Sequence, residues 1–98
     1  MIKNALPPIH PGEFLRETLD ALGLTQVAFA TAIGVSPMRI SHVLKGSRPV
    51  TAELALRFGR AFAQSAQYWL NLQTAYDLKT TEAALQDALQ AVHELAAA

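Results

Sequence analysis

Apolar residues along this chain recur at intervals of three and four positions, a spacing that places them on one face of an α-helix. Three prolines keep the first eleven residues extended, and a helix is expected from about Gly12 to Leu22. Gly23 suits the C-terminal end of this helix. Its apolar face carries Phe14, Leu15, Leu19 and Leu22. His10, just before the helix, is expected to form a local hydrogen bond that fixes the helix start.

The next two segments are bounded by start and stop signals. Thr25 is a good N-cap for a helix over residues 26–33, which Gly34 ends. Ser36 caps a third helix whose first residue is a proline, at a position where the missing N–H costs nothing. Gly46 ends this third helix, so both segments are predicted to be short.

A fourth and a fifth helix follow. Thr51 caps the fourth, which runs to about Ala63, and Ser65 caps the fifth. The fifth carries large apolar groups at Tyr68, Trp69, Leu72 and Tyr76. Trp69 is expected in the core or at a dimer interface, and no cofactor site is predicted.

The last helical segment, 82–98, is expected to start at Thr80 or Thr81. Its apolar residues form a heptad-like seam that is too short for a stable isolated coiled coil. The seam consists of Leu85, Leu89, Val92 and Ala96. The fold prediction is all-α, with one five-helix domain over residues 1–79 and a C-terminal helical arm over 80–98. Three roles stay open for the arm: packing on its own domain, pairing across a dimer, or contacting a partner.

The second and third helices have the features of a helix-turn-helix motif over about residues 25–45. The turn between them is Gly34-Val35-Ser36, and Gly34 is expected at a positive φ. The small Ala30, four positions earlier, lets the two helices cross closely. The wedge between them is filled by Phe29, Ile33, Val35, Ile40 and Val43.

The exposed face of the third helix follows from the rotation of about 100° per residue. Three side chains share the side that must face the core: Ile40, Val43 and Leu44. Five lie on or beside the opposite side: Met38, Arg39, Ser41, His42 and Lys45. A short helix that presents polar, basic and apolar groups in this way fits the major groove of DNA.

Each exposed group suits one feature of DNA. Arg39 is able to reach guanine O6 and N7, and Met38 to touch a thymine methyl. Ser41 and His42 suit donors and acceptors on base edges. Gln26, at the start of the second helix, is placed to meet a phosphate, assisted by backbone N–H groups there.

The DNA backbone is expected to be held after the recognition helix by Lys45, Ser47 and Arg48. An isolated helix with exposed basic side chains is usually only a solvated face. The DNA-binding prediction therefore depends on the complete motif together with the distribution of charge.

Charge is unevenly distributed along the 98 residues, although the net charge is zero. Residues 36–60 carry five basic side chains against one carboxylate, a net charge of +4. Both flanks are negative, at −1 for residues 1–35 and −3 for residues 61–98. A local basic patch, and not the total charge, produces the electrostatic footprint of a nucleic-acid-binding protein.

Several function classes are disfavoured by the composition. The chain has no cysteine, no Gly-rich phosphate loop and no HExxH motif, and its three histidines fall on different segments. We therefore expect neither an enzyme nor a metal site. Since no signal peptide and no apolar run of about 20 residues is found, a cytoplasmic protein without a membrane partner is expected.

The motif and two flanking stretches resemble a known family. "LTQVAFATAIGVSPMRISHVLKGSRPVT" resembles the Xre/phage-repressor class of helix-turn-helix proteins. "PPIHPGEFLRETL" and "FAQSAQYWLNLQTAYDL" are similar to the HigA-type antitoxins of toxin–antitoxin modules, and the resemblance covers about residues 6–79.

The resemblance implies a homodimer that binds a palindromic operator in its own promoter. It also implies neutralisation of a small, basic, mRNA-cleaving toxin. Family members contact DNA at the positions of Gln26, Met38, Arg39, Ser41, His42, Lys45 and Arg48. Family members often have Arg or another polar residue where this chain has Pro37, and a small polar residue where it has Arg39, so a different base readout is expected. A stand-alone Xre-type regulator without a toxin is the alternative.

An acidic stripe on the first helix is a candidate toxin contact. Glu13, Glu17 and Asp20 recur at helical spacing, and Arg16 is positioned to pair with the first or the last of them. Such a stripe is often only a solvated face. If it is functional, charge complementarity would speed association with a basic partner more than it would tighten the complex.

Overall fold

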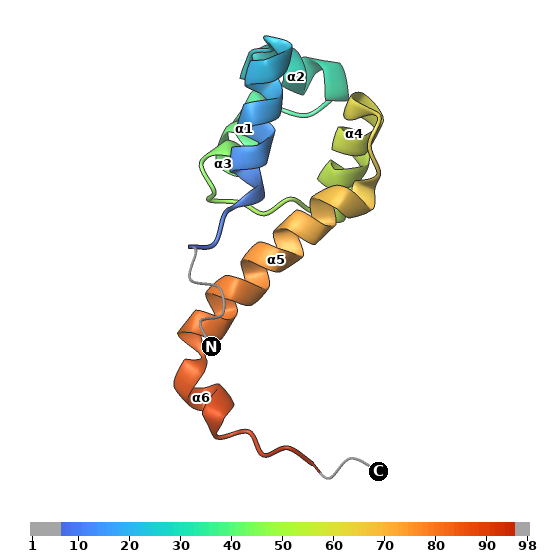
Figure 1. Cartoon of the computed structure of the whole chain (residues 1–98). Helices are drawn as coiled ribbons and strands as arrows, with labels where there is room; N and C mark the ends of the chain where they lie inside the picture. Colours follow the sequence, from blue (N-terminus) through green and yellow to red (C-terminus); the bar gives the residue numbers. More distant parts are fainter. Residues whose placement is uncertain (1–6, 96–98) are drawn as a thin grey trace.

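Six α-helices make up the part of the chain that the computed structural model describes, residues 7–95 (Figure 1). No strand occurs within that range. The helices are α1 (Pro11–Leu22), α2 (Gln26–Ile33), α3 (Pro37–Leu44), α4 (Ala52–Phe62), α5 (Ala66–Ala84) and α6 (Gln86–Gln90). The all-α prediction is confirmed.

Side-chain caps start the first five helices as the sequence predicted. Thr25, Ser36, Thr51 and Ser65 each accept a hydrogen bond from a backbone N–H in the first turn of the following helix. His10 does the same for α1, because its Nδ1 accepts from Gly12 N at 2.9 Å. Pro11 is the first residue of α1, where the sequence analysis had placed it in the extended segment.

Left-handed residues close three of the helices. Gly23 follows α1 with φ 67°, and Gly34 follows α2 with φ 75°, a region that favours glycine because it has no Cβ. Ala63 takes the same role after α4 with φ 54°, although it is not a glycine. The stop predicted at Gly34 is therefore confirmed with its positive φ.

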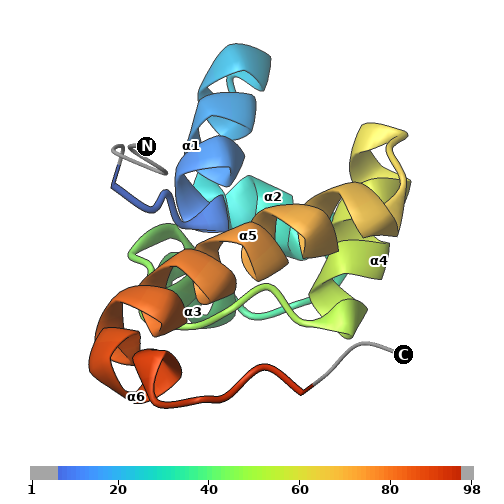
Figure 2. The same ribbon diagram turned by 60° about the horizontal axis from the view of Figure 1, so that its bottom comes forward.

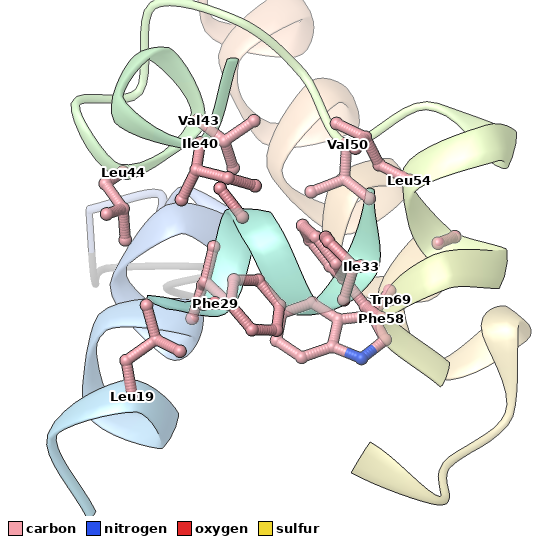
Figure 3. Close-up of a cluster of buried hydrophobic side chains, with 13 residues drawn as sticks. Leu19, Phe29, Ile33, Ile40, Val43, Leu44, Val50, Leu54, Phe58 and Trp69 are labelled. Atoms are coloured by element: carbon pink, nitrogen blue, oxygen red, sulfur yellow. The ribbon is translucent and has the colours of Figure 1, made fainter. Parts of the chain in front are cut away.

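The core lies where α1 to α5 meet, and Figure 3 shows its side chains converging from these helices. Trp69 is fully buried, with its ring 5.2 Å edge-on from Phe58. Its indole Nε1 donates to Gln64 Oε1 at 2.9 Å, so the polar end of the ring has a partner. Trp69 is thus a core residue, one of the two roles expected from the sequence.

Helix α1 begins directly against the end of α3. Gly12 lies so close to α3 that a Cβ added to it would overlap the Val43 carbonyl oxygen. Arg16 donates to the Leu44 carbonyl at 3.4 Å, and the His10 ring lies edge-on to Tyr76 of α5 at 4.9 Å. The stretch from His10 to Arg16 therefore fixes the position of the third helix, whose outer face is the predicted recognition surface.

The C-terminal arm differs from the prediction. Helix α5 continues through the expected boundary at Thr80 or Thr81 and ends at Ala84. Thr80 is not a cap, because its hydroxyl donates to the Tyr76 carbonyl within the same helix at 3.0 Å. A Thr in mid-helix and a Thr before a helix have the same local sequence signal, so the predicted start was wrong.

The predicted helix over 82–98 is also not formed as one piece. The chain bends at Leu85, α6 is five residues long, and residues 91–95 are not helical. Leu85, Leu89 and Val92 are exposed, so these three seam residues do not belong to the hydrophobic core of the described chain. The fourth seam residue, Ala96, lies outside the described residues.

No single helix within residues 7–95 is long and apolar enough to cross a membrane. Only α2 and α3 counted together, as a pair bent by 120°, pass on length and composition.

Candidate nucleic-acid interface

Helices α2 and α3 form the predicted helix-turn-helix unit. They meet at a bend of 120° across the turn, within the range typical of this motif. Ala30 is fully buried at the crossing, and its carbonyl accepts from Val35 N at 3.0 Å. Of the five residues predicted to fill the wedge, Phe29, Ile33, Ile40 and Val43 are buried, and Val35 is half-buried.

A shallow groove of about 660 Å³ lies between the start of α2 and the outer face of α3. Figure 2 shows these two helices from the side on which α5 crosses them. The groove is lined by Thr25, Gln26, Val27, Pro37, Met38, Ser41, His42 and Lys45. Five residues predicted to contact DNA are therefore brought together here: Gln26, Met38, Ser41, His42 and Lys45.

Val27 is the groove residue that sequence reasoning missed. Its side chain is 60% exposed, and Met38, which lines the same groove, is 67% exposed, so the groove presents apolar as well as polar side chains. An exposed valine at the second position of a short helix was the available signal. Apolar groups of this kind suit thymine methyls in a major groove.

Arg39 lies on the flank of α3 and not in the groove. Its NH2 donates to Glu53 Oε1 of α4 at 3.3 Å, an ion pair between exposed side chains. The sequence analysis placed Arg39 among the base-contacting residues without identifying this partner. The Glu53 carboxylate is also bound by Arg57, whose Nε donates to Oε2 at 3.1 Å.

The pairing with two guanidinium groups changes the titration of Glu53. The hydrogen bond from Arg39 is the largest cause that lowers the pKa of Glu53, with further lowering by Arg57. Glu53 is therefore ionised at neutral pH. Sequence reasoning assigned no role to this residue, although the spacing of Glu53 and Arg57 is that of a helical ion pair.

The connection from α3 to α4 holds the remaining predicted DNA contacts. The Ser47 hydroxyl donates to the His42 carbonyl at 3.1 Å, and the Ser47 and Arg48 backbone N–H groups point to the same carbonyl. Ser47 thus closes the C-terminal end of α3. Lys45, which lines the groove, and Arg48, three residues later, are both exposed, so their charges lie at and after the C-terminal end of α3.

The acidic stripe lies on a different surface of the molecule. Glu13, Glu17 and Asp20 are exposed on α1. The predicted pairing of Arg16 with Glu13 or Asp20 is wrong, since Arg16 bonds to the α3 carbonyl instead. Glu17 borders a second groove of about 530 Å³ between the C-terminal halves of α1 and α4.

Among residues 7–95 no group of three or more metal-binding side chains comes together. Gln73 of α5 is buried, and its Oε1 accepts from Val50 N at 2.7 Å. Its Nε2 donates to Asp77. Gln73 therefore ties α5 to the loop that leads from α3 into α4.

Comparison with known proteins gives a consistent family. A profile of the helix-turn-helix family matches residues 15–69. Virulence-associated protein I of Dichelobacter nodosus is 53% identical over 82% of this chain and 75% of its own length. Antitoxin HigA-1 of Vibrio cholerae is 33% identical over 97% of this chain and 90% of its own length.

A solved structure shows the same fold over most of the chain. The Pseudomonas aeruginosa antitoxin HigA, determined with the higBA promoter, has a TM-score of 0.87 and is 38% identical. The match covers 91% of this chain and 99% of that protein. The motif geometry, the family profile and these relatives agree, and the chain belongs to the helix-turn-helix family as a HigA-type member of its Xre class.

Proposed function

We propose that this chain is the antitoxin of a toxin–antitoxin module, which represses its own promoter as a dimer and neutralises an mRNA-cleaving toxin. The observation that carries the DNA-binding half is the groove on α2 and α3, because five independently predicted contact residues line it. The determination of a HigA relative with its promoter supports the same role.

In this proposal α3 enters the major groove with its exposed side toward the bases. Met38, Ser41 and His42 face base edges, while Lys45 and Arg48 hold phosphates beyond the end of α3. Gln26 meets a phosphate at the start of α2, where backbone N–H groups point outward. Ser47 supports this end of α3 through its bond to the His42 carbonyl.

A palindromic operator requires two copies of α3 related by a two-fold axis. A groove of about 700 Å³ between the N-terminal segment, α1, α5 and α6 is mostly apolar, with Ile9, Leu78 and Leu85 exposed around it. Lys79 and Glu82 also line it, so the patch carries both signs of charge, which suits the self-complementary interface of a two-fold dimer. We assign this groove to the homodimer, whose two recognition helices would lie about 34 Å apart.

The toxin is assigned to the exposed face of α1 that carries the acidic stripe. The stripe of Glu13, Glu17 and Asp20 supplies negative charge for a basic partner, and the groove beside Glu17 offers an apolar contact at Leu22 and Phe62. The stripe lies outside the α2–α3 groove, so toxin binding and DNA binding use separate surfaces of one chain.

The DNA-binding half is tested by affinity measurements on the upstream DNA at several salt concentrations. Lys45→Ala should weaken binding to all sequences alike and lower the salt slope by roughly one unit, because one phosphate contact is lost. Arg60→Ala removes an exposed positive charge on α4, away from the groove, and should leave the slope unchanged. Equal slopes for the wild type and Lys45→Ala would exclude the phosphate contact.

The antitoxin half is tested by co-purification. The tagged chain is expressed with its native flanking genes, and a small basic protein that arrests translation when released should elute with it. Reversing Glu13, Glu17 and Asp20 to lysine should weaken that complex and spare DNA binding, whereas reversing Asp87 and Glu94 on the arm should not weaken it. A dimer that elutes alone and still binds its upstream DNA would be a repressor without a toxin.

A further inference from the structure

A continuous set of polar contacts joins three helices beside the recognition surface. Arg57 of α4 donates through NH1 to the Ile33 carbonyl, the last residue of α2, at 2.7 Å. Its Nε donates to Glu53 Oε2 at 3.1 Å, and Glu53 Oε1 accepts from Arg39 NH2 of α3 at 3.3 Å. The order of contacts is thus the α2 terminus, Arg57, Glu53 and Arg39.

Arg57 holds the carboxylate of Glu53 on the side away from Arg39. Arg57 is anchored at one end by a backbone carbonyl of the helix-turn-helix unit, so it holds Glu53 Oε2 in a position set by α2. The other oxygen faces α3 and bonds Arg39. Because both carboxylate oxygens have guanidinium partners, the Glu53 side chain is restrained and does not move freely with Arg39.

Arg39 keeps most of its bonding capacity in this pair. A guanidinium group has five N–H donors in a planar fork, and the bond to Glu53 uses NH2 alone. The Arg39 side chain is 43% exposed, so its remaining donors are accessible to a second acceptor. A guanine offers two acceptors, O6 and N7, that match the edge of such a fork.

The Arg39–Glu53 ion pair contributes little to the stability of the fold. Ion pairs between exposed side chains contribute little to stability because water screens both charges, and the two partners here are 43% and 52% exposed. Holding an arginine in one orientation has a larger effect on binding, because the ordering of a long side chain otherwise opposes association. The fixed carboxylate of Glu53 also repels a phosphate group because both are negative, so a phosphate contact at Arg39 is disfavoured.

We infer that Glu53 is a positioning residue of the DNA interface, which holds Arg39 for contact with a guanine and thereby sets sequence preference at one base pair of each half-site. This inference rests on the proposed operator binding. It assigns Arg39 to base readout and not to the phosphates, and it makes Glu53 a determinant of specificity without any contact to DNA.

The test measures affinities for a set of operators in which each base pair is substituted in turn. Wild type, Glu53→Gln, Arg39→Ala and the double variant are compared. In Glu53→Gln, the preference for guanine over other bases at one symmetric pair of positions should fall about fivefold to tenfold. This is part of the discrimination that an arginine–guanine contact provides. Its affinity for unrelated DNA should rise, since a negative charge beside the interface is removed.

Arg39→Ala should lose the preference at the same positions, and adding Glu53→Gln to it should change nothing further there. This non-additivity identifies action through Arg39. Glu94→Gln makes the same chemical change on the exposed arm and should leave the whole preference profile as in the wild type.

The outcomes separate this inference from the proposed function. A wild-type protein that does not distinguish its operator from shuffled DNA would overturn operator binding itself. If the wild type discriminates and Glu53→Gln lowers affinity equally at every position, Glu53 has only a structural role and the inference is wrong. The inference is also wrong if Glu53→Gln keeps every preference.

Discussion

The helix-turn-helix unit and the C-terminal arm are both predicted as helical from local signals, yet only in the first do the predicted helix starts and turn form. In α2 and α3 every start signal is a formed cap, and the five residues predicted to fill the wedge between the helices are buried or half-buried. In the arm the start signal at Thr80 lies inside a helix, and the apolar residues Leu85, Leu89 and Val92 are exposed. Local signals are reliable where tertiary burial acts in the same direction.

The physical basis of this difference is that a short helix gains most of its stability from packing. Each helix of the unit has a core on one side, so slipping a boundary would expose a buried side chain such as Ile40. Among the described residues, the end of α5 and all of α6 carry no buried side chain that would fix a boundary in this way. Their boundaries depend on intrinsic helix propensities, which are weak in comparison with packing.

The largest expected contrast between the two regions is in core truncations. Ile40→Ala removes a fully buried side chain and should lower the free energy of unfolding by about 2–5 kcal/mol. Val92→Ala removes an apolar group that is 69% exposed and should cost less than about 0.5 kcal/mol. Urea unfolding followed by far-UV circular dichroism measures both, and similar losses for the two variants would contradict the described packing of the arm.

The next contrast separates close packing from turn geometry. Gly12→Ala places a methyl group on the Val43 carbonyl and should cost about 1–3 kcal/mol, because α1 must move away from α3. Gly23→Ala meets no atom within 4 Å but is strained at φ 67°, with a cost of roughly 1–2 kcal/mol. Only Gly12→Ala should also weaken operator binding under conditions where both variants are folded, and equal DNA affinities would show that α1 does not position α3.

A smaller contrast concerns the hydroxyl caps. Ser36→Ala removes the hydrogen bond to Arg39 N and should cost about 1 kcal/mol. Thr80→Ala should change stability by no more than about 0.5 kcal/mol, since Thr80 lies inside α5 and alanine is the better helix former. Thermal unfolding compares them, and a loss at Thr80 as large as that at Ser36 would support the predicted helix start.

The smallest expected effect is a pH dependence at the start of α1. Burial is the main cause that lowers the pKa of His10 below its usual value of 6.5, against weaker raising contributions from the Arg48 backbone, Asp77 and Glu13. The folded protein therefore binds fewer protons than the unfolded chain. Stability should be constant above about pH 6.5 and fall as the pH is lowered toward the folded pKa.

His10→Asn keeps a capping acceptor without a titrating ring, so it is the matched variant for this effect. The slope of unfolding free energy between pH 6.5 and lower pH should be smaller in His10→Asn than in the wild type. An identical slope in both proteins would assign the pH dependence to other groups.

Much of the candidate site was predictable because the signals are local. Residues 25–45 carry the caps, the glycine and the apolar positions that define α2 and α3, and their order alone places Met38, His42 and Lys45 on the outer face. The partner of Arg39 was not predictable in this way. Glu53 is 14 positions away on another helix, and only the packing of α4 beside α3 brings the two side chains together.

The sequence by itself determined the helix starts, the turn and the identity of the outer face of α3, since caps, glycines and apolar spacing act over a few residues. The tertiary structure alone decided three features: the contact of Gly12 with α3, the chain of contacts from Ile33 to Arg39, and the continuation of α5 past Thr80. Each depends on segments far apart in sequence, or on the absence of a packing constraint. Contacts between distant segments and the absence of a packing constraint are not encoded in the spacing of neighbouring residues.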